Sequence, residues 1–380
     1  MNSKAILTPL FAIISLLACG VSASAYSVAD TYWVSDNVGY VTVEGSTVYA
    51  PAGTDGLYVL DISDATDIQL LGHMKLSGGD LSHWTSVLNG DYLYTVDQNY
   101  GVRVFDVHAP ANISLVGGWE YFDTPTQDKA SLVLKDSYLY YTPWAAETQI
   151  LDIGDVNNIQ QVGTFRLRDY TYATEPGSVM MSYVSGDVMY TSFGYGGFHT
   201  IDVSNPTSPV YLDGVYQPEK SDVCRFVLRD GYAYLAGGDF GFHIIDVSDP
   251  SNISEIYSYE FTPGEDLNGS YSMVLGPKNE SGLQYVFTWE GWNIGNQVMH
   301  VWDVTDPTNP VEIADYPRPS GYPIGAVSEY YEGYLVAGVS TGFVATYDVT
   351  EYHIPEPGTL LMASTGILGI VMAIRRRKRK

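Results

Sequence analysis

Residues 241–250 read Gly-Phe-His-Ile-Ile-Asp-Val-Ser-Asp-Pro, an apolar run followed by an aspartate, a β-branched residue and a turn sequence. The core of this pattern, an apolar or aromatic residue, then Asp, then Ile or Val, recurs at near-regular intervals. The seven aspartates are Asp61, Asp106, Asp152, Asp202, Asp246, Asp303 and Asp348. Their spacings are 45, 46, 50, 44, 57 and 45 residues. A period of roughly 40–50 residues made of short strands is typical of the blades of a β-propeller.

One repeat divides into four short strands. We expect them at residues 85–88, 92–96, 102–107 and 113–117, where apolar, β-branched and aromatic residues alternate with turns rich in Gly, Asp and Asn. No sustained helical period occurs in this region. The sequence therefore predicts an all-β fold, a seven-bladed β-propeller over residues 26–352.

The last repeat is incomplete. Strands are expected at 326–328, 334–338 and 343–349, and the chain then runs into its C-terminal tail without a fourth strand. An open ring would leave an exposed strand edge. Residues 26–34 precede the first repeat and are long enough for a strand. We expect this N-terminal strand to complete the last blade and close the ring.

The recurring aspartate has two interpretations. A short carboxylate at a strand end accepts backbone N–H bonds in the following turn, and a proline such as Pro250 fixes φ there. The alternative is one calcium ion per blade, held by pairs such as Asp246 and Asp249. Calcium needs six or more oxygen ligands, and the sequence has no EF-hand-like loop. No cofactor is expected, and calcium stays an open alternative.

The N-terminus has the features of an export signal. Lys4 precedes an apolar run over residues 5–18, and Ala23-Ser24-Ala25 matches the small-residue pattern of a cleavage site. Residues 1–25 are therefore predicted to be a signal peptide. The sequence Leu-Leu-Ala-Cys at 16–19 also matches a lipobox, so processing that leaves a lipidated Cys19 stays open.

The C-terminus combines three features. Pro355, Glu356 and Pro357 precede an apolar run over residues 359–374, and six consecutive cations end the chain. The apolar run is short against the about 20 residues that usually span a bilayer. The cations hold the end of the chain on the cytoplasmic side. A plain single-pass anchor is the simpler interpretation of this tail.

Two resemblances follow from these residues. The tail, residues 353–380, resembles the PEP-CTERM sorting signal, and the repeats from about Tyr40 to Tyr352 resemble the LVIVD repeat family, best at 241–250. The repeat around Asp152 departs from the pattern, since it lacks the preceding Gly and the following Pro. The first resemblance implies an exosortase-like processing enzyme, transient anchoring in the inner membrane, and final location in the envelope, at the surface or outside the cell. The second implies an architecture and no agreed activity.

Charge and cysteine content limit the partners. Without Lys4 and the six terminal cations, residues 26–354 hold 11 basic and 43 acidic residues, a formal charge of −32. Nucleic acid is therefore excluded as a partner, since its phosphates would be repelled. Cys19 lies in the leader and Cys224 stands alone, so no intramolecular disulfide is expected.

Propellers usually bind ligands at the mouth of the central channel, on loops that lead into the innermost strands. Mixed charges on these loops form a candidate ligand or cation site, although solvated loop charges are the simpler interpretation. The residues are Asp80, His83, Asp128, Lys129, Glu175, Lys220, Asp222, Arg225 and Asp266.

Two further groups attract interest. His199, His243 and His300 each precede a repeat aspartate by three residues, so they occupy equivalent places in different blades and cannot share one metal ion. Trp289 and Trp292 lie in the longest repeat, in a Gly/Asn-rich stretch, and are candidates for stacking on a sugar. The alternative is that these tryptophans pack against a neighbouring blade.

No Gly-x-Ser-x-Gly turn, phosphate-binding Gly loop or His-Glu-x-x-His motif is present, so no catalytic residue is assigned. The leading hypothesis is an exported, non-catalytic binding or scaffold protein of the envelope or matrix, with a polysaccharide or an envelope protein as partner. The alternative is a metal-assisted hydrolase or lactonase with a cation at the channel mouth.

Overall fold

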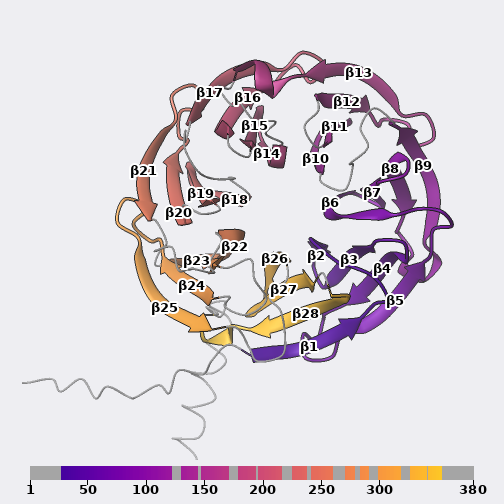
Figure 1. Cartoon of the computed structure of the whole chain (residues 1–380), viewed down its shortest axis with the longest axis horizontal. Helices are drawn as coiled ribbons and strands as arrows, with labels where there is room; N and C mark the ends of the chain where they lie inside the picture. The colour runs from indigo at the N-terminus through magenta and orange to yellow at the C-terminus, as the bar shows by residue number, and fades with distance from the viewer. Residues whose placement is uncertain are drawn as a thin grey trace, which may run out of the picture.

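The computed structural model describes residues 27–121, 130–143, 147–170, 179–193, 196–215, 225–237, 241–259, 270–278, 283–290, 298–317, 326–339 and 341–352. Within them the strands form seven four-stranded sheets arranged as blades around a central channel (Figure 1). The predicted seven-bladed β-propeller is therefore confirmed. Among the described residues no helix is long and apolar enough to cross a bilayer.

Each blade runs outward from its first strand. Blade 1 contains β2 (Thr42–Glu44), β3 (Thr47–Ala52), β4 (Gly56–Asp61) and β5 (Gln69–Met74). Blade 2 contains β6 (Leu81–Asn89), β7 (Tyr92–Asp97), β8 (Gly101–Asp106) and β9 (Ser114–Glu120). Blade 3 contains β10 (Ala130–Lys135), β11 (Tyr138–Pro143), β12 (Thr148–Asp152) and β13 (Gln160–Phe165). Blade 4 contains β14 (Val179–Ser185), β15 (Val188–Phe193), β16 (Gly197–Asp202) and β17 (Val210–Val215).

The remaining blades follow the same order. Blade 5 contains β18 (Arg225–Arg229), β19 (Tyr232–Gly237), β20 (Gly241–Asp246) and β21 (Ser254–Tyr259). Blade 6 contains β22 (Ser270–Lys278), β23 (Gln284–Glu290), β24 (Val298–Asp303) and β25 (Val311–Pro317). Blade 7 contains β26 (Ala326–Tyr331), β27 (Tyr334–Val339), β28 (Phe343–Asp348) and, outermost, β1 (Ser27–Trp33). Short 3-10 turns occur at η1 (Pro110–Asn112), η2 (Leu167–Tyr170) and η4 (Thr350–Tyr352).

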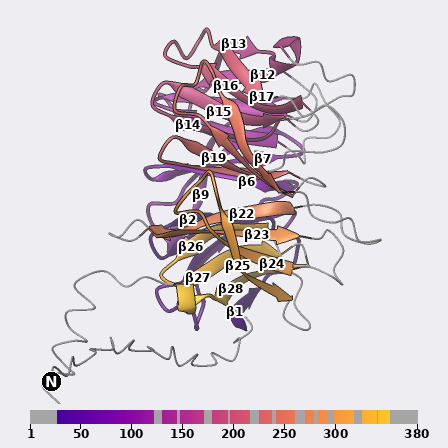
Figure 2. The same ribbon diagram turned by 90° about the vertical axis from the view of Figure 1, so that its left-hand side faces the viewer.

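The N-terminal strand closes the ring, as predicted. β1 pairs antiparallel with β28, from Ser27 opposite Asp348 to Trp33 opposite Phe343. The two strands lie side by side in both views of the ribbon, although they come from opposite ends of the described chain (Figures 1 and 2). Closure therefore depends on main-chain hydrogen bonds between the two ends, and it removes the open edge that the last blade would otherwise present.

The core lies between neighbouring blades. Seven apolar clusters occur, one at each blade-to-blade joint. The cluster at the closing joint contains Val336 and Val344 of blade 7 with Val48, Leu60 and other residues of blade 1. The second and third strands of the blades are buried along most of their length because both of their faces meet another sheet.

The repeat aspartate caps the turn that follows the third strand. In every blade its Oδ1 accepts the main-chain N–H of the residue two positions later, at 2.8 to 3.1 Å. In four blades the next acidic residue repeats the arrangement, for example Asp249 Oδ1 with Ser251 N at 3.0 Å. The turn-capping interpretation of these aspartates is therefore confirmed, and the sequence motif exists because of this local geometry.

At one position of the outermost strand, five of the seven blade joints fall into two kinds, and blades 5 and 6 have Tyr257 and Ala314 there. In blades 1, 2 and 3 this position is Gly72, Gly117 and Gly163, and a Cβ built there would lie 1.7, 1.9 and 2.9 Å from a carbonyl oxygen in the next blade's turn. In blades 4 and 7 it is an aspartate, Asp213 and Asp30. The turn therefore packs directly on glycine in three joints and bonds to a side chain in two.

The aspartate joints also need a threonine on the neighbouring strand. Asp30 Oδ2 accepts the N–H of Ile68 at 2.6 Å, and Thr346 Oγ1 donates to the carbonyl of Ala65 at 2.5 Å. Asp213 binds Ile253 N at 2.8 Å and Thr200 binds the Pro250 carbonyl at 2.6 Å in the same way. The glycine joints have Val59, Val104 and Ile150 in place of these threonines.

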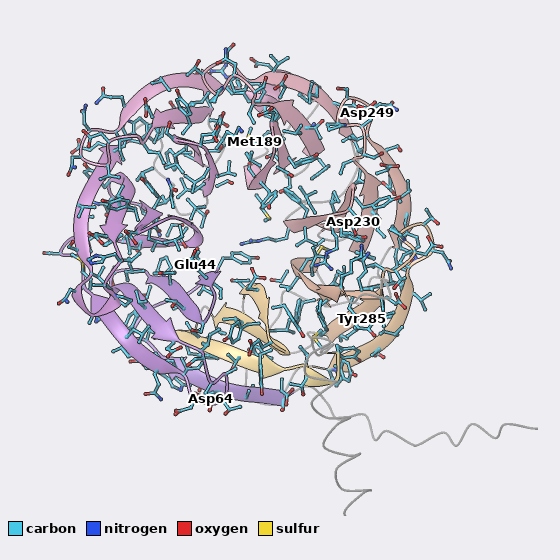
Figure 3. The ribbon with its side chains drawn as sticks, turned by 180° about the vertical axis from the view of Figure 1, so that it is seen from behind. Glu44, Asp64, Met189, Asp230, Asp249 and Tyr285 are labelled. Atoms are coloured by element: carbon cyan, nitrogen blue, oxygen red, sulfur yellow. The ribbon has the colours of Figure 1, made fainter. Side chains whose placement is uncertain are left out.

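One face of the ring, which we call the acidic face, carries the hairpins between the first and second strands. Each of the six described hairpins of this kind contributes a carboxylate, namely Glu44, Asp91, Asp136, Asp187, Asp230 and Glu332. The repeat aspartates share this face, because the residue after each one donates its N–H to a carbonyl of the hairpin, as Val247 does to Gly231 at 2.8 Å. Asp64 and Asp249 lie near its rim (Figure 3). The opposite face, where the chain enters each first strand, is called the mouth face.

Candidate functional site: the central channel

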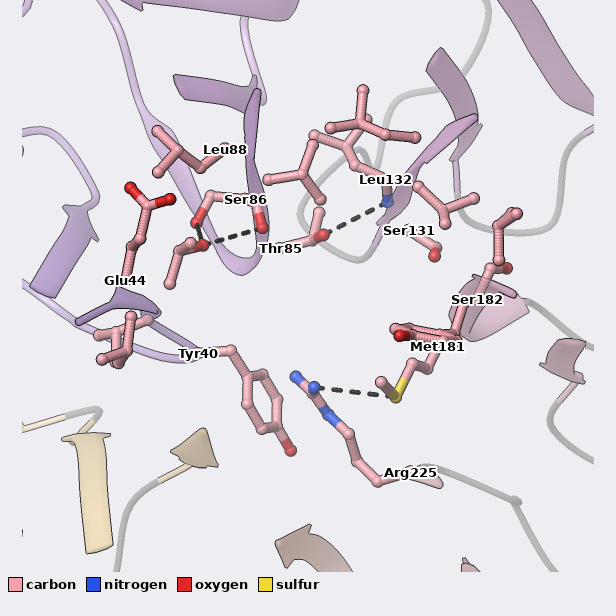
Figure 4. A pocket seen from close by; sticks show the side chains of 18 residues that line it. Tyr40, Glu44, Thr85, Ser86, Leu88, Ser131, Leu132, Met181, Ser182 and Arg225 are labelled. Atoms are coloured by element: carbon pink, nitrogen blue, oxygen red, sulfur yellow. Dashed lines mark hydrogen bonds between the residues drawn. The ribbon is translucent and has the colours of Figure 1, made fainter. Parts of the chain in front are cut away.

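The first strands surround a cavity in the channel. Its volume is about 470 Å³, and it is lined by residues of the first strands of blades 1 to 4 and by Arg225 of blade 5 (Figure 4). This volume is within the roughly 300–1,000 Å³ of typical small-molecule sites. The cavity is therefore large enough to receive a small polar group or one unit of a polymer.

Strand register places five residues at one level of this channel. In each of blades 1 to 5 a tyrosine of the second strand, namely Tyr49, Tyr94, Tyr140, Tyr190 or Tyr234, pairs with a residue of the first strand. The residue two positions before that partner lies at the same level in every one of these blades. The five residues are Tyr40, Thr85, Ser131, Met181 and Arg225. Because the repeats are equivalent, these side chains form part of a ring near the mouth face.

Hydroxyl groups satisfy the free edges of the first strands. A first strand has no partner on its channel side, so its outward N–H and C=O groups need other acceptors and donors. Val41 N donates to Ser328 Oγ of blade 7 at 2.9 Å, and Leu132 N donates to Thr85 Oγ1 of blade 2 at 3.3 Å. Thr42 Oγ1 donates to the Ser86 carbonyl at 3.0 Å. The channel wall therefore combines hydroxyl and main-chain groups with apolar side chains such as Val43, Val87 and Leu134.

Arg225 crosses the channel toward blade 1. Its guanidinium carbon lies 3.0 Å from the centroid of the Tyr40 ring, a cation–π contact between blades that are far apart in sequence. Its Nη1 lies 3.9 Å from Met181 Sδ, a weak acceptor. Figure 4 shows the guanidinium group between Tyr40 and Met181, directed into the cavity.

A second polar group lies where the segment after β1 meets blade 1. The nearly buried Asp55 accepts hydrogen bonds from the hydroxyls of Ser35 and Tyr58, and its Oδ1 lies 3.2 Å from Lys75 Nζ. These hydrogen bonds hold the pKa of Asp55 well below its usual range, with the Ser35 bond the largest cause. Burial, with the neighbouring Asp55 carboxylate, raises the pKa of Tyr58 to about 12. The imidazole of His73 stacks on Tyr58 with ring centroids 4.0 Å apart.

This group has a structural explanation. Ser35 and Asp36 follow the closing strand, and Asp36 Oδ2 accepts both the N–H and the hydroxyl of Thr54 in blade 1, at 2.9 and 2.6 Å. The Asp55 group therefore links the N-terminal segment to the first blade. Sequence reasoning missed this group, because its members are spread over Ser35 to Lys75 without a recognisable spacing.

The structure describes only part of the predicted channel-mouth set. Arg225 lies in the channel wall. Asp80 lies on the mouth face, where its N–H donates to Asp97 Oδ1 at 3.3 Å; Asp97 is fully buried and also pairs with Arg103 Nε at 2.9 Å. His83 lies in β6. The other predicted residues lie outside the described residues: Asp128, Lys129, Glu175, Lys220, Asp222 and Asp266.

The stacking role expected for Trp289 is wrong. Its side chain is only 3% exposed and packs in the cluster between blades 6 and 7 with Met299 and Tyr316. The physical reason is that β23 continues to Glu290, so Trp289 belongs to a second strand with covered faces and not to the loop. The alternative that it packs against a neighbouring blade is correct. Trp292 lies outside the described residues.

The three equivalent histidines lie on third strands, each with its own partner. His199 Nε2 bonds the Gly196 carbonyl at 2.9 Å, His243 Nδ1 lies 3.5 Å from Glu255, and His300 Nδ1 lies 2.6 Å from Glu312. Burial lowers the pKa of His199 to about 4. These histidines do not converge, as expected. Among the described residues no three His, Cys, Asp or Glu side chains gather to hold a metal ion.

Similar solved structures identify the class of protein. The β-propeller domain of Cps50 (Swd1) from Myceliophteria thermophila is 14% identical, with a TM-score of 0.59 over 84% of this chain and 99% of that one. The WD40 β-propeller domain of Doa1 is 11% identical, with a TM-score of 0.59 over 85% and 96%. BamB from Moraxella catarrhalis is 12% identical, with a TM-score of 0.51 over 83% and 85%. At these identities the likeness shows the fold alone: the chain is a β-propeller.

Sequence families identify its repeats and its tail. The LVIVD repeat matches residues 33–75, 85–120, 176–216 and 221–260, which are blades 1, 2, 4 and 5. Blade 3, whose sequence departs from the pattern, is not among the matches. The PEP-CTERM protein-sorting motif matches residues 353–378. The protein is therefore a seven-bladed propeller with LVIVD repeats and a PEP-CTERM sorting signal, which indicates export. No curated protein matches the chain in sequence.

The two ends of the chain carry predictions that the structure does not address. The signal peptide over residues 1–25 lies outside the described residues. The sorting residues Pro355, Glu356 and Pro357 and the apolar segment that follows them also lie outside. The family match supports the sorting motif, and the choice of leader processing at Cys19 stays a prediction.

Proposed function

We propose that this protein is an exported, non-catalytic binding module that holds an extracellular polysaccharide through its central channel. The PEP-CTERM motif supports processing by an exosortase-type enzyme, after transient anchoring in the inner membrane, and a final place in the envelope or matrix. An envelope protein that inserts a polar loop into the same channel is the competing partner.

The channel cavity is the observation that carries this proposal. Its 470 Å³ are lined by threonine and serine hydroxyls, by Tyr40 and Tyr183, by the Glu44 carboxylate and the Arg225 guanidinium group, and by apolar side chains between them. Hydroxyls and main-chain groups match the alternating donors and acceptors of a sugar, and the few polar groups of a ligand site fix its orientation. On the acidic face, in contrast, the repeat aspartates accept hydrogen bonds from the N–H groups of their own turns.

Filling the cavity tests the proposal. Thr85→Trp places a large ring in the channel (Figure 4), whereas Thr164→Trp makes the same change on the exposed face of β13. Binding of the purified protein to a panel of neutral and acidic polysaccharides is measured by calorimetry. We expect saturable binding by the parent protein and Thr164→Trp, and a loss of at least about tenfold, or 1.4 kcal/mol, for Thr85→Trp.

The outcomes separate the hypotheses. Equal binding by Thr85→Trp and the parent would place the site outside the channel and contradict the proposal. A preparation that binds no polysaccharide, retains a stoichiometric metal ion after dialysis and hydrolyses esters or lactones would support the metal-assisted enzyme instead. Both variants are checked for unchanged melting before their affinities are compared.

A further inference from the structure

Among the described residues, Arg225 has few partners for its hydrogen-bond donors. The Tyr40 ring contacts the flat face of the guanidinium group at 3.0 Å, and a stacked guanidinium keeps its N–H groups in the plane, directed away from the ring. The one hydrogen-bond partner that the described residues offer these donors is Met181 Sδ at 3.9 Å, a weak acceptor. The contact to tyrosine thus orients the fork of guanidinium N–H groups, and no described residue other than Met181 accepts a hydrogen bond from it.

Most other described basic side chains form an ion pair with an acidic residue. Lys75 pairs with Asp55, Arg103 with Asp97, Lys135 with Asp136 and Asp187, Arg166 with Glu147, and Lys278 with Asp230. No described Asp or Glu pairs with Arg225. Arg229 also lacks a described acidic partner, but its Nη1 donates to the Gly276 carbonyl at 2.9 Å, whereas the described acceptor for Arg225 is only a thioether.

The described carboxylates are distributed unevenly around Arg225. The repeat aspartates and hairpin carboxylates lie on the acidic face, at the far ends of the first strands. On the mouth face Asp55, Asp97 and Glu147 are already paired with cations. For an anionic group that enters from the mouth face, Arg225 precedes the described carboxylates of the acidic face, including Glu44 in the cavity lining, and the narrow, protein-lined cavity strengthens the attraction to the guanidinium group.

We propose that Arg225 and Tyr40 bind a carboxylate-bearing sugar unit, a hexuronate, of the polysaccharide that enters the channel. This inference rests on the proposed function and names the ligand class. A carboxylate accepts two parallel N–H bonds from the arginine fork, and the hydroxyls of Thr85 and Ser131 at the same level of the channel are placed for the sugar hydroxyls. One carboxylate bound at the partly buried Arg225 is compatible with a strongly acidic protein that repels a dense polyanion such as nucleic acid.

A matched pair of probes isolates the charge. A trimer of galacturonic acid and its methyl ester differ in their negative charges and in one methyl group per carboxyl, and calorimetry compares their affinities for the full-length protein. We expect the parent protein to bind the acid about 10- to 100-fold more tightly than the ester, a preference that falls with added salt. Arg225→Gln is expected to abolish the preference, and Tyr40→Leu to reduce it by disordering the fork.

Controls keep the test decisive. Arg166→Gln removes an exposed arginine that pairs with Glu147, and it should keep the preference for the acid. If Arg225→Gln does not fold, Arg225→Lys keeps the charge but lacks the fork, and it should retain only part of the preference. Equal affinity for acid and ester in the parent protein, or a preference unchanged by Arg225→Gln, would overturn the inference.

Failure of this inference is distinguishable from failure of the proposed function. Binding of both trimers alike, still blocked by Thr85→Trp, would keep the channel as a polysaccharide site and remove the role of Arg225. Binding of neither trimer and of no polysaccharide would reject both. Free glucuronate that competes as strongly as the trimer would show a site for small carboxylates and overturn the assignment to a polysaccharide.

Discussion

Replacing Asp30 by glycine is expected to weaken the joint that closes the ring. Asp30→Gly leaves the partly buried N–H of Ile68 without its 2.6 Å acceptor, and Thr346→Val leaves the Ala65 carbonyl without its 2.5 Å donor. An unsatisfied buried group costs about 1–3 kcal/mol, so each single change should lower the free energy of unfolding by about 2 kcal/mol. An unfolding entropy of about 2.1 cal/mol/K per residue converts this loss to a drop in Tm of about 3 °C for residues 27–352.

The double variant is the informative one. Asp30→Gly with Thr346→Val recreates the pairing of Val59 with Gly72, in which the next turn packs directly on glycine. The two losses should then overlap, and the double variant should be more stable than the sum predicts by about 1 kcal/mol. Denaturant unfolding gives the four free energies of the cycle.

The matched control lies inside the ring. Asp213→Gly and Thr200→Val make the same changes between blades 4 and 5, where neither strand is terminal. Hydrogen exchange should accelerate in β1 for the Asp30 variant and stay unchanged there for the Asp213 variant. Strictly additive losses at both joints would refute the idea that threonine and aspartate act as one unit.

Three further outcomes are expected. Burial lowers the pKa of His199 to about 4 from an ordinary 6.5, so its contribution to the free energy of unfolding should be complete above pH 6.5 and should fall by about 3 kcal/mol as the pH drops toward 4. His199→Gln should remove this pH dependence. An identical pH profile of unfolding in the variant would argue against it. Gly117→Ala should lower the free energy of unfolding by about 3 kcal/mol or more, because its Cβ would lie 1.9 Å from the Val156 carbonyl oxygen. Gly90→Ala has open space around it but a φ of 57°, so it should lower the free energy of unfolding by about 1 kcal/mol, and thermal melting compares the two variants. Asp246→Ala removes the acceptor for Ser248 N and should lower the free energy of unfolding by about 1 kcal/mol, as measured with denaturant. An unchanged free energy would show that water replaces the carboxylate and would contradict this expectation.

Local repeats made most of the fold predictable. The aspartate pattern sets a turn through bonds that span two residues, so its geometry is encoded within each repeat. The missing fourth strand of the last repeat indicated that residues 26–34 would close the ring, because an open sheet edge needs a partner. The strand ends were predicted less well: β6 begins at Leu81, four residues before the expected start.

The site was less accessible to sequence reasoning. Arg225 could be assigned to the mouth of the channel from its place in the repeat, but its contact with Tyr40 joins residues 185 positions apart and exists only because the ring closes. Trp289 was misjudged because its strand extends further than the Gly/Asn-rich composition after it suggested. The glycine and aspartate joints were also missed, since the partners of each lie in different blades.

The acidic face has a consequence for how the protein stands on a membrane. The chain leaves β28 at Asp348, and the next residue bonds to Gly333 in the hairpin of that face, so the segment that leads to the sorting motif starts there. While the C-terminus is anchored, the segment that leads to the anchor starts on the acidic face, whose carboxylates are repelled by anionic lipid headgroups. The mouth face is then directed away from the tether, so the proposed polysaccharide would reach Arg225 whether or not the tail is cut.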